Sequence, residues 1–170
     1  MTLSPTTTPP AIVVTGGAGY LGRCTMEVLQ DKGFQPICLD NYSTSRRLDS
    51  AAIPQYDLDV GDAALLSKTW KTLPPIAGIL HFAAFALVGE SSENPGRYFR
   101  NNLLATLALA EIAARENIPL IHSSSCAVYG VPAQEIDLKR FLDLASRHVG
   151  RRMNLLLALA GNVLKAFPGV

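Results

Sequence analysis

The stretch AIVVTGGAGYLG, residues 11–22, decides the fold class of this chain. Its first five residues form an apolar run typical of a buried strand, and an amphipathic helix is predicted to begin at Tyr20. A glycine cluster directly between a strand and a helix is the context of a dinucleotide-binding turn. In such a turn Gly16 permits the tight bend, Gly19 lets the backbone approach a pyrophosphate, and Gly22 allows the helix to pack closely on the strand. The alternative is a glycine turn that binds no ligand.

Asp40 is the second residue that points to a dinucleotide. It ends the next predicted strand, residues 35–40, at about the distance from the glycine loop that the fingerprint requires. A carboxylate there can accept hydrogen bonds from both hydroxyls of an adenosine ribose, and it would repel a 2′-phosphate. The sequence therefore predicts NAD rather than NADP. The alternative is that Asp40 only begins a turn together with Asn41.

Short apolar runs alternate with longer amphipathic runs along most of the chain, which is the pattern of an α/β protein. Five strands are predicted, over residues 11–15, 35–40, about 56–58, 78–84 and 118–125. Helices are predicted over residues 20–32, closed by Gly33, over 62–73, with Asp62 as the N-cap, and over 95–116. This alternation predicts an α/β fold, a Rossmann-like doubly wound parallel sheet of about five strands.

Three parts are predicted along the chain. Residues 1–10, rich in threonine and proline, form a disordered tail without the features of a secretory signal. Residues 11–132 form an NAD-binding Rossmann-like domain. Residues 133–170 show two helical stretches, about 134–148 and 152–166, and no strand, so they are predicted to form a helical tail.

Composition narrows the class of protein and its partners. The chain has 170 residues, 48% of them apolar and 17% charged, which predicts a globular domain. A net charge of +1 gives no reason to expect nucleic acid or an anionic membrane as a partner. The three cysteines, Cys24, Cys38 and Cys126, are odd in number and far apart, which argues against a disulfide framework and a zinc site. We therefore expect a cytoplasmic protein with no metal site.

Five segments together resemble the N-terminal half of the UDP-glucose 4-epimerase family, which belongs to the extended short-chain dehydrogenases/reductases. They are VTGGAGYLG, CLDNYSTS, DLDVGD, ILHFAAFALVGESSENPGRYFRNN and HSSSCAVYG. The sequence HFAA, followed by VGES and then by NN, is the most discriminating part. Related nucleotide-sugar dehydratases and decarboxylases share the glycine loop and the VYG but are less similar in that middle segment. The resemblance covers about residues 11–132.

The resemblance implies a role for each matching residue. The implied cofactor-binding residues are Gly16, Gly19, Tyr20, Leu21 and Gly22 at the pyrophosphate; Asp40, Asn41 and Ser45 at the adenosine ribose; Asp59 and Val60 at the adenine; Phe82, Ala83, Ala84 and Asn101 against the cofactor; and Ser123 near the nicotinamide. Ser125 matches the catalytic serine that hydrogen-bonds the 4′-hydroxyl of the sugar. One departure is Ala86, at a position where epimerases usually carry a lysine near the cofactor, which should weaken cofactor binding.

Several of these positions have purely structural alternatives. Asp59 could cap the following turn, Asn101 could stabilise the long helix, and the serines at 123–125 could satisfy neighbouring backbone groups at a strand end. His81 and His122 lie in predicted strands, which favours core histidines over catalysts.

The resemblance also implies a mechanism that this sequence does not complete. The family removes the 4′-hydroxyl proton with a tyrosinate, whose pKa is lowered by a lysine four residues later. None of the five tyrosines here is followed by a lysine at the fourth position, and the sugar-binding region of the family is absent from the sequence. We therefore expect an NAD-binding, epimerase-like chain of the isomerase class that is catalytically incomplete, with a UDP-sugar as a weak further ligand. The alternatives are a non-catalytic nucleotide-binding module, with self-association of an uncovered face, and another NAD-dependent sugar-nucleotide epimerase or dehydratase.

Overall fold

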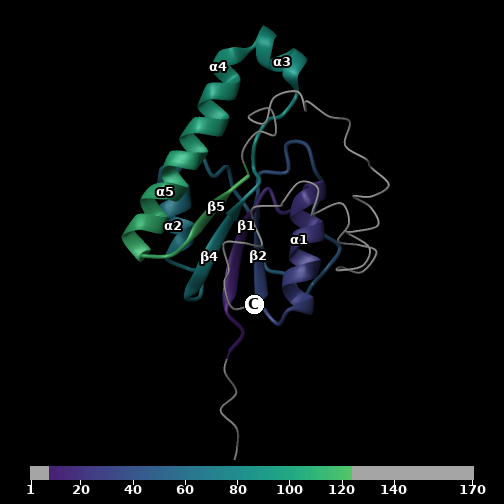
Figure 1. Cartoon of the computed structure of the whole chain (residues 1–170), viewed down its shortest axis with the longest axis vertical. Coiled ribbons are helices and arrows are strands. Elements are labelled where there is room, and N and C mark those ends of the chain that lie inside the picture. The colour runs from purple at the N-terminus through teal and green to yellow at the C-terminus, as the bar shows by residue number, and fades with distance from the viewer. Residues whose placement is uncertain (1–7, 124–170) are drawn as a thin grey trace, which may run out of the picture. The chain divides into compact units, whose positions relative to one another are not determined.

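The computed structural model describes residues 8–123, which form a parallel sheet with helices on both faces (Figure 1). The five strands are β1 Ala11–Thr15, β2 Gln35–Asp40, β3 Gln55–Asp57, β4 Ile76–His81 and β5 Leu120–His122. Their order in the sheet is β3-β2-β1-β4-β5, and every neighbouring pair is parallel. The chain thus adds strands outward from β1 in one direction and then in the other. This arrangement confirms the predicted Rossmann-like doubly wound fold, whose crevice opens at the carboxyl ends of β1 and β4.

Three helices cover the sheet. Helix α1 (Tyr20–Asp31) lies on one face, and helices α2 (Ala63–Trp70) and α5 (Leu104–Glu116) lie on the other (Figure 1). Asp62 accepts a hydrogen bond from the Leu65 amide at 3.0 Å, which is the predicted N-cap of α2. Gly33, which follows α1, has a φ of +80°, the left-handed conformation that ends helices and that glycine adopts without steric cost.

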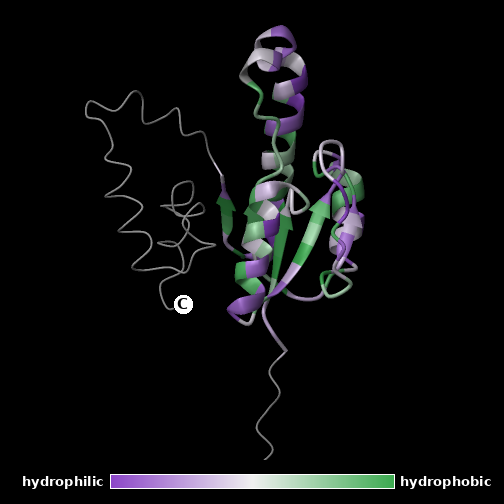
Figure 2. Ribbon diagram, turned by 90° about the vertical axis from the view of Figure 1, so that its right-hand side faces the viewer, coloured by the Kyte–Doolittle hydropathy of each residue, from purple (hydrophilic) through white to green (hydrophobic). Residues whose placement is uncertain are grey.

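The core lies between the sheet and the α2–α5 layer. Inward-facing strand residues such as Val13, Leu39 and Ile79 pack with Leu66 of α2 and Leu109 of α5, and all five are almost fully buried. Figure 2 shows that the strands are the most hydrophobic elements, as expected for a parallel sheet that is covered on both faces. The core therefore holds in place the strands whose carboxyl ends border the crevice.

Two predicted elements differ from the structure near that crevice. The strand predicted over 78–84 ends at His81, because the Phe82 amide still bonds to the Thr15 oxygen (3.0 Å) but the glycine loop then turns away from the sheet. Residues 82–87 consequently form a loop. The strand predicted over 118–125 covers only Leu120–His122 of the residues that the structure describes.

The long predicted helix over 95–116 is present but not uniform. It consists of α4 (Pro95–Tyr98), a π-helical segment (Phe99–Leu103) and α5, and it is preceded by a short helix, α3 (Val88–Glu93), which the sequence did not predict. The predicted helical tail, 133–170, and most of the predicted disordered tail lie outside the described residues. No helix in the part of the chain that the structure describes is long and apolar enough to cross a membrane.

Candidate functional site

The glycine loop between β1 and α1 forms one side of the candidate site. Gly16 has a φ of +66°, and a Cβ at this position would lie 2.7 Å from the backbone nitrogen of Ala83. A Cβ at Gly22 would collide with the carbonyl oxygen of Gly16. Both glycines are therefore required by close backbone approach. The Gly16 amide donates to the Leu39 oxygen at 2.9 Å, which holds the loop beside the end of β2.

Asp40 lies at the end of β2, opposite this loop, and is only 8% exposed. Its Oδ2 accepts a hydrogen bond from the Ala18 amide at 2.9 Å. Its Oδ1 accepts from the Tyr42 amide at 2.8 Å and from the Ser45 hydroxyl at 3.1 Å. Asp40 thus takes part in a turn, as the structural alternative proposed, and it also joins that turn to the glycine loop. Charge-assisted bonds of this kind are about twice as strong as bonds between neutral groups.

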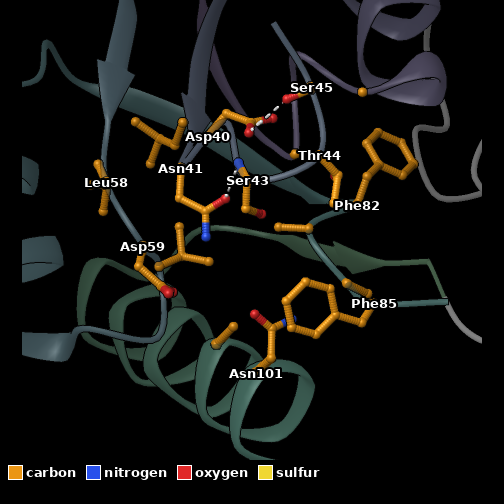
Figure 3. A pocket seen from close by; sticks show the side chains of 17 residues that line it. Asp40, Asn41, Ser43, Thr44, Ser45, Leu58, Asp59, Phe82, Phe85 and Asn101 are labelled. Atoms are coloured by element: carbon orange, nitrogen blue, oxygen red, sulfur yellow. Dashed lines mark hydrogen bonds between the residues drawn. The ribbon is translucent and has the colours of Figure 1, made fainter. Parts of the chain in front are cut away.

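Two further polar side chains reach the site from the ends of β2 and β3. Asn41 Oδ1 accepts from the Ser43 amide at 3.1 Å, and Asp59 Oδ1 accepts from the Gly61 amide at 2.8 Å. The turn-capping alternative for Asp59 is therefore present in the structure. Figure 3 shows that both side chains are nevertheless directed toward the space that they border.

These segments enclose a pocket with an empty volume of about 640 Å³, which includes its opening to solvent (Figure 3). The pocket brings together eleven of the residues that the sequence singled out: Gly16, Gly19, Asp40, Asn41, Ser45, Asp59, Val60, Phe82, Ala83, Ala84 and Asn101. It adds six that the sequence did not single out: Leu39, Ser43, Thr44, Leu58, Phe85 and Ala105. Residues from five separate segments of the sequence therefore meet at the predicted crevice.

The other predicted site residues do not line this pocket. Tyr20 is 63% exposed and Leu21 is partly exposed at the start of α1, and Gly22 is buried at the junction of loop and helix. Ser123 is exposed and directly follows β5. Ser125 lies outside the described residues. The ligand contacts assigned to all these positions stay predictions.

The wall opposite Asp40 is the loop Phe82–Phe85, and Asn102 holds the backbone of this loop in place. The Phe85 amide donates to Asn102 Oδ1 at 2.9 Å, and Asn102 Nδ2 donates to the Phe85 oxygen at 3.0 Å. Asn101 Nδ2 in turn donates to Asn102 Oδ1 at 2.8 Å. Both asparagines lie in the π-helical segment, a type of irregularity that is frequent at functional sites. The only sequence signal for the bonds from Asn102 to Phe85 was the pair Asn101-Asn102 in the first part of the long predicted helix.

Arg23 is a second positioning side chain that the sequence analysis missed. Its Nε donates to the Ala18 oxygen at 2.7 Å, and its guanidinium also bonds to the carbonyl oxygens of Arg46 and Arg47. Arg23 therefore links the glycine loop to the segment that carries Ser45. Its position on α1, one residue after Gly22, gives no sign of this role without the fold.

Comparison with known proteins assigns a family to this architecture. A model of the NAD dependent epimerase/dehydratase family matches residues 12–147. The chain belongs to the NAD dependent epimerase/dehydratase family. The match extends past residue 132, where the sequence predicted the NAD-binding domain to end. That boundary lies outside the described residues and stays a prediction.

Relatives within this family confirm the resemblance that the sequence indicated. The UDP-glucose 4-epimerase of Rhizobium leguminosarum bv. trifolii is 39% identical over 122 residues, which cover 71% of this chain and 37% of that protein. The bifunctional UDP-glucose 4-epimerase and UDP-xylose 4-epimerase 1 of Pisum sativum is 34% identical over 169 residues, covering 92% of this chain and 48% of that protein.

A solved structure extends the likeness to the fold. The UDP-glucose 4-epimerase from Bifidobacterium longum, in complex with NAD+ and UDP, matches with a TM-score of 0.64 and 35% identity, covering 74% of this chain and 40% of that one. The chain therefore spans less than half the length of each of these three proteins.

The tyrosines near the pocket of this epimerase-family chain do not have the properties of a base. Burial, and secondarily the nearby Cys38 thiol, raise the pKa of Tyr42 to about 12. Desolvation and a hydrogen bond to Glu90 also raise the pKa of Tyr98. A tyrosine that removes a proton near pH 7 needs a lowered pKa instead. Neither Tyr42 nor Tyr98 therefore has the lowered pKa that such a base needs.

Proposed function

We propose that this chain is a UDP-glucose 4-epimerase-like protein that binds NAD between the glycine loop and the Phe82–Phe85 segment. The observation that carries the proposal is the 2.9 Å hydrogen bond from the Ala18 amide to Asp40 Oδ2. It fixes the loop that would hold the pyrophosphate relative to the carboxylate that would hold the adenosine ribose. Such preorganisation lowers the entropic cost of binding a long, flexible cofactor.

The state of the Asp40 carboxylate fits a ribose. A carboxylate offers about four acceptor sites, and three donors of the protein use one site each. One site on Oδ2 remains for a ribose hydroxyl, and a second hydroxyl would take the place of the Ser45 hydroxyl. The same fixed negative charge would repel the additional phosphate of NADP. These features support NAD as the cofactor.

The rest of the pocket fits the other parts of the cofactor. Gly16 and Gly19 line the pocket next to the N-terminus of α1, where backbone amides and the helix dipole favour a pyrophosphate. Asp59 and Val60 would lie against the adenine. Asn101 and the Phe82–Ala84 segment, from the opposite wall, would lie beneath the middle of the cofactor.

We further propose that the 170-residue chain does not catalyse epimerisation by itself. For the family reaction, the interconversion of UDP-galactose and UDP-glucose, bound NAD would supply the hydride-transfer chemistry. The proton transfer that must accompany it needs the tyrosine and lysine pair, which this sequence lacks. Loss of a general base costs about two to four orders of magnitude in rate. A UDP-sugar is a weak further ligand in this proposal, and cytoplasmic location and self-association stay predictions.

The binding proposal is tested by calorimetric titration of NAD into three chains: the unaltered protein, Asp40→Asn and Asp49→Asn. Asp49 is exposed and does not line the pocket, so its substitution is a control for the same change in charge. Asp40→Asn should raise the Kd for NAD about 10-fold or more, since hydrogen bonds to a charged group contribute about 1.5–3 kcal/mol each. Asp49→Asn should leave the Kd unchanged. Equal affinity of all three chains would refute the assignment of Asp40.

The catalytic proposal is tested by following the conversion of UDP-galactose to UDP-glucose with saturating NAD. We expect no turnover above background. Clear turnover would overturn the proposal. Turnover of a different UDP-sugar would favour the alternative of another epimerase or dehydratase, and NAD binding without any turnover would fit an NAD-binding module.

A further inference from the structure

A chain of hydrogen bonds runs from the end of β1 to the start of the long helix through His81. Thr15 Oγ1 lies 2.6 Å from His81 Nδ1, and His81 Nε2 lies 3.3 Å from Thr106 Oγ1. Thr106 Oγ1 donates in turn to the backbone oxygen of Asn102 at 2.8 Å. Thr15 and His81 are directly opposite each other in the β1–β4 pair, and both are buried to 1% exposure or less. His81 therefore connects the central strands to the helix that carries the two asparagines.

The donor and acceptor in each bond can be assigned by starting from the bond between Thr106 and Asn102. A backbone oxygen only accepts, so the single hydroxyl proton of Thr106 is committed to Asn102. Thr106 Oγ1 must then accept the Nε2 proton of His81, and in the neutral imidazole Nδ1 accepts the Thr15 hydroxyl proton. This arrangement needs a neutral imidazole with its proton on Nε2. Burial, with a smaller effect of His122, lowers the pKa of His81 to about 4, so the neutral form holds at pH 7.

The residues at both ends of this series of hydrogen bonds also bond to the Phe82–Phe85 wall of the pocket. At one end the Thr15 oxygen accepts from the Phe82 amide at 3.0 Å. At the other end the Asn102 side chain makes both of its bonds to the Phe85 backbone. The wall is thus a loop whose two ends are held by residues that His81 connects. An apolar core residue at position 81 could pack there, but it could not satisfy two hydroxyls on opposite sides.

We propose that His81 is a positioning residue for the cofactor pocket, acting through Thr106 and Asn102 to hold the Phe82–Phe85 wall against the glycine loop. This role rests on the proposed NAD site. The pocket is sensitive to the position of this wall, because the glycine loop approaches Ala83 so closely that a Cβ at Gly16 would not fit between them. A small displacement of the wall therefore changes the width of the pocket at the place where the middle of the cofactor would lie.

The test uses Thr106, because a substitution of the fully buried His81 could prevent folding. Thr106→Val removes the hydroxyl and keeps the shape, and Thr106→Ser restores the hydroxyl. Thr72→Val is the matched control, since Thr72 also bonds to a backbone oxygen, that of Thr69 at 2.7 Å, but lies at the end of α2 away from the pocket. Two quantities are measured in the full 170-residue chain: amide hydrogen exchange at Phe85 by NMR, and the Kd for NAD by calorimetry.

Thr106→Val removes two hydrogen bonds, one to His81 and one to the Asn102 oxygen, so it should accelerate exchange at Phe85 and raise the Kd for NAD, each about 5-fold or more. Exchange at Leu66, whose amide is bonded to the Asp62 oxygen at 2.8 Å, should not change. Thr106→Ser should restore both values, and Thr72→Val should alter neither. A purely structural role would instead accelerate exchange throughout the domain and lower the melting temperature without a selective effect at Phe85.

Unchanged exchange at Phe85 in Thr106→Val would overturn the inference, whatever the affinity for NAD. Accelerated exchange with an unchanged Kd would overturn it as well, because the wall would then not control binding. An unaltered chain that binds no NAD, while Thr106→Val still accelerates exchange at Phe85, would overturn the proposed cofactor site and support the mechanical role of the hydrogen-bonded chain.

Discussion

The two sides of the pocket are built in opposite ways. On the Asp40 side, a charged side chain faces the pocket and is held by backbone and hydroxyl donors from nearby turns. On the Phe85 side, a loop borders the pocket, and its backbone is held by the side chain of Asn102, which lies 17 residues further along the chain. The first side provides a fixed charge, which selects a ligand chemically. The second provides a shape, whose precision depends on a distant helix.

The largest effect is expected from a side chain at Gly16, where the two sides of the pocket are in contact. Gly16→Ala should lower the free energy of unfolding by about 3 kcal/mol or more and abolish NAD binding, because positive φ and a backbone clash act together. Gly33→Ala is the control: it has a φ of +80°, but its Cβ would meet nothing within 4 Å. It should cost only about 1–2 kcal/mol and leave NAD affinity intact. Equal losses in urea denaturation would show that the contact with Ala83 is unimportant.

The second effect is a pH dependence that arises on the Phe85 side. The pKa of His81 is lowered from 6.5 to about 4 in the folded chain. Between these values the unfolded chain binds a proton that the folded chain does not, so stability falls as the pH falls. Between pH 7 and pH 5 this group should remove about 2 kcal/mol of unfolding free energy. The NMR signal of the His81 ring should show no titration above pH 5, and a midpoint near 6.5 would contradict the buried neutral tautomer.

A smaller effect is expected from removing the clamp on Phe85 alone. Asn102→Ala loses both bonds to the Phe85 backbone and should raise the Kd for NAD about 10-fold, with the two losses partly compensated by water. Asn94→Ala, at the start of α4 and outside the pocket, should have no effect on the Kd. If both variants bind NAD like the unaltered chain, the bonds from Asn102 to Phe85 are not needed for binding, and the proposed difference between the two sides is wrong.

The smallest effect is expected at Ser45, on the Asp40 side. Its hydroxyl bond to Asp40 would be exchanged for a ribose hydroxyl, so Ser45→Ala should change the Kd for NAD by no more than about 2-fold. Ser50→Ala is the comparison, since Ser50 accepts a bond from the Ala52 amide outside the pocket. A 10-fold weakening specific to Ser45→Ala would mean that Ser45 is a direct ligand contact.

The Asp40 side was predictable from the sequence because its parts are local. A strand, a glycine loop and an acidic residue at a set spacing fix one another, and the structure brings Gly16, Gly19 and Asp40 into one pocket. The doubly wound parallel sheet also follows from the alternation of elements and the right-handed crossover rule, whereas the strand order β3-β2-β1-β4-β5 comes from the structure. Local spacing thus predicts which residues line the pocket on this side.

The Phe85 side was less predictable because its contacts join distant segments. The apolar run over 78–84 extends beyond the point where β1 ends, so hydrophobicity alone placed Phe82–Ala84 in a strand. His81 had the pattern of an ordinary core histidine, and only the structure shows that both of its ring nitrogens are bonded, one to β1 and one to α5. The role of Arg23 likewise depends on a loop that contains Arg46 and Arg47, and hydrophobic periodicity does not predict where such a loop lies.

The central claim is that the pocket between these two sides is a site for NAD. Its most direct test is a calorimetric titration of the unaltered chain with NAD and, separately, with NADP. The account predicts saturable binding of one NAD per chain, with NADP at least about 10-fold weaker because Asp40 repels its 2′-phosphate. Absence of NAD binding up to millimolar concentration, or equal affinity for the two cofactors, would contradict it.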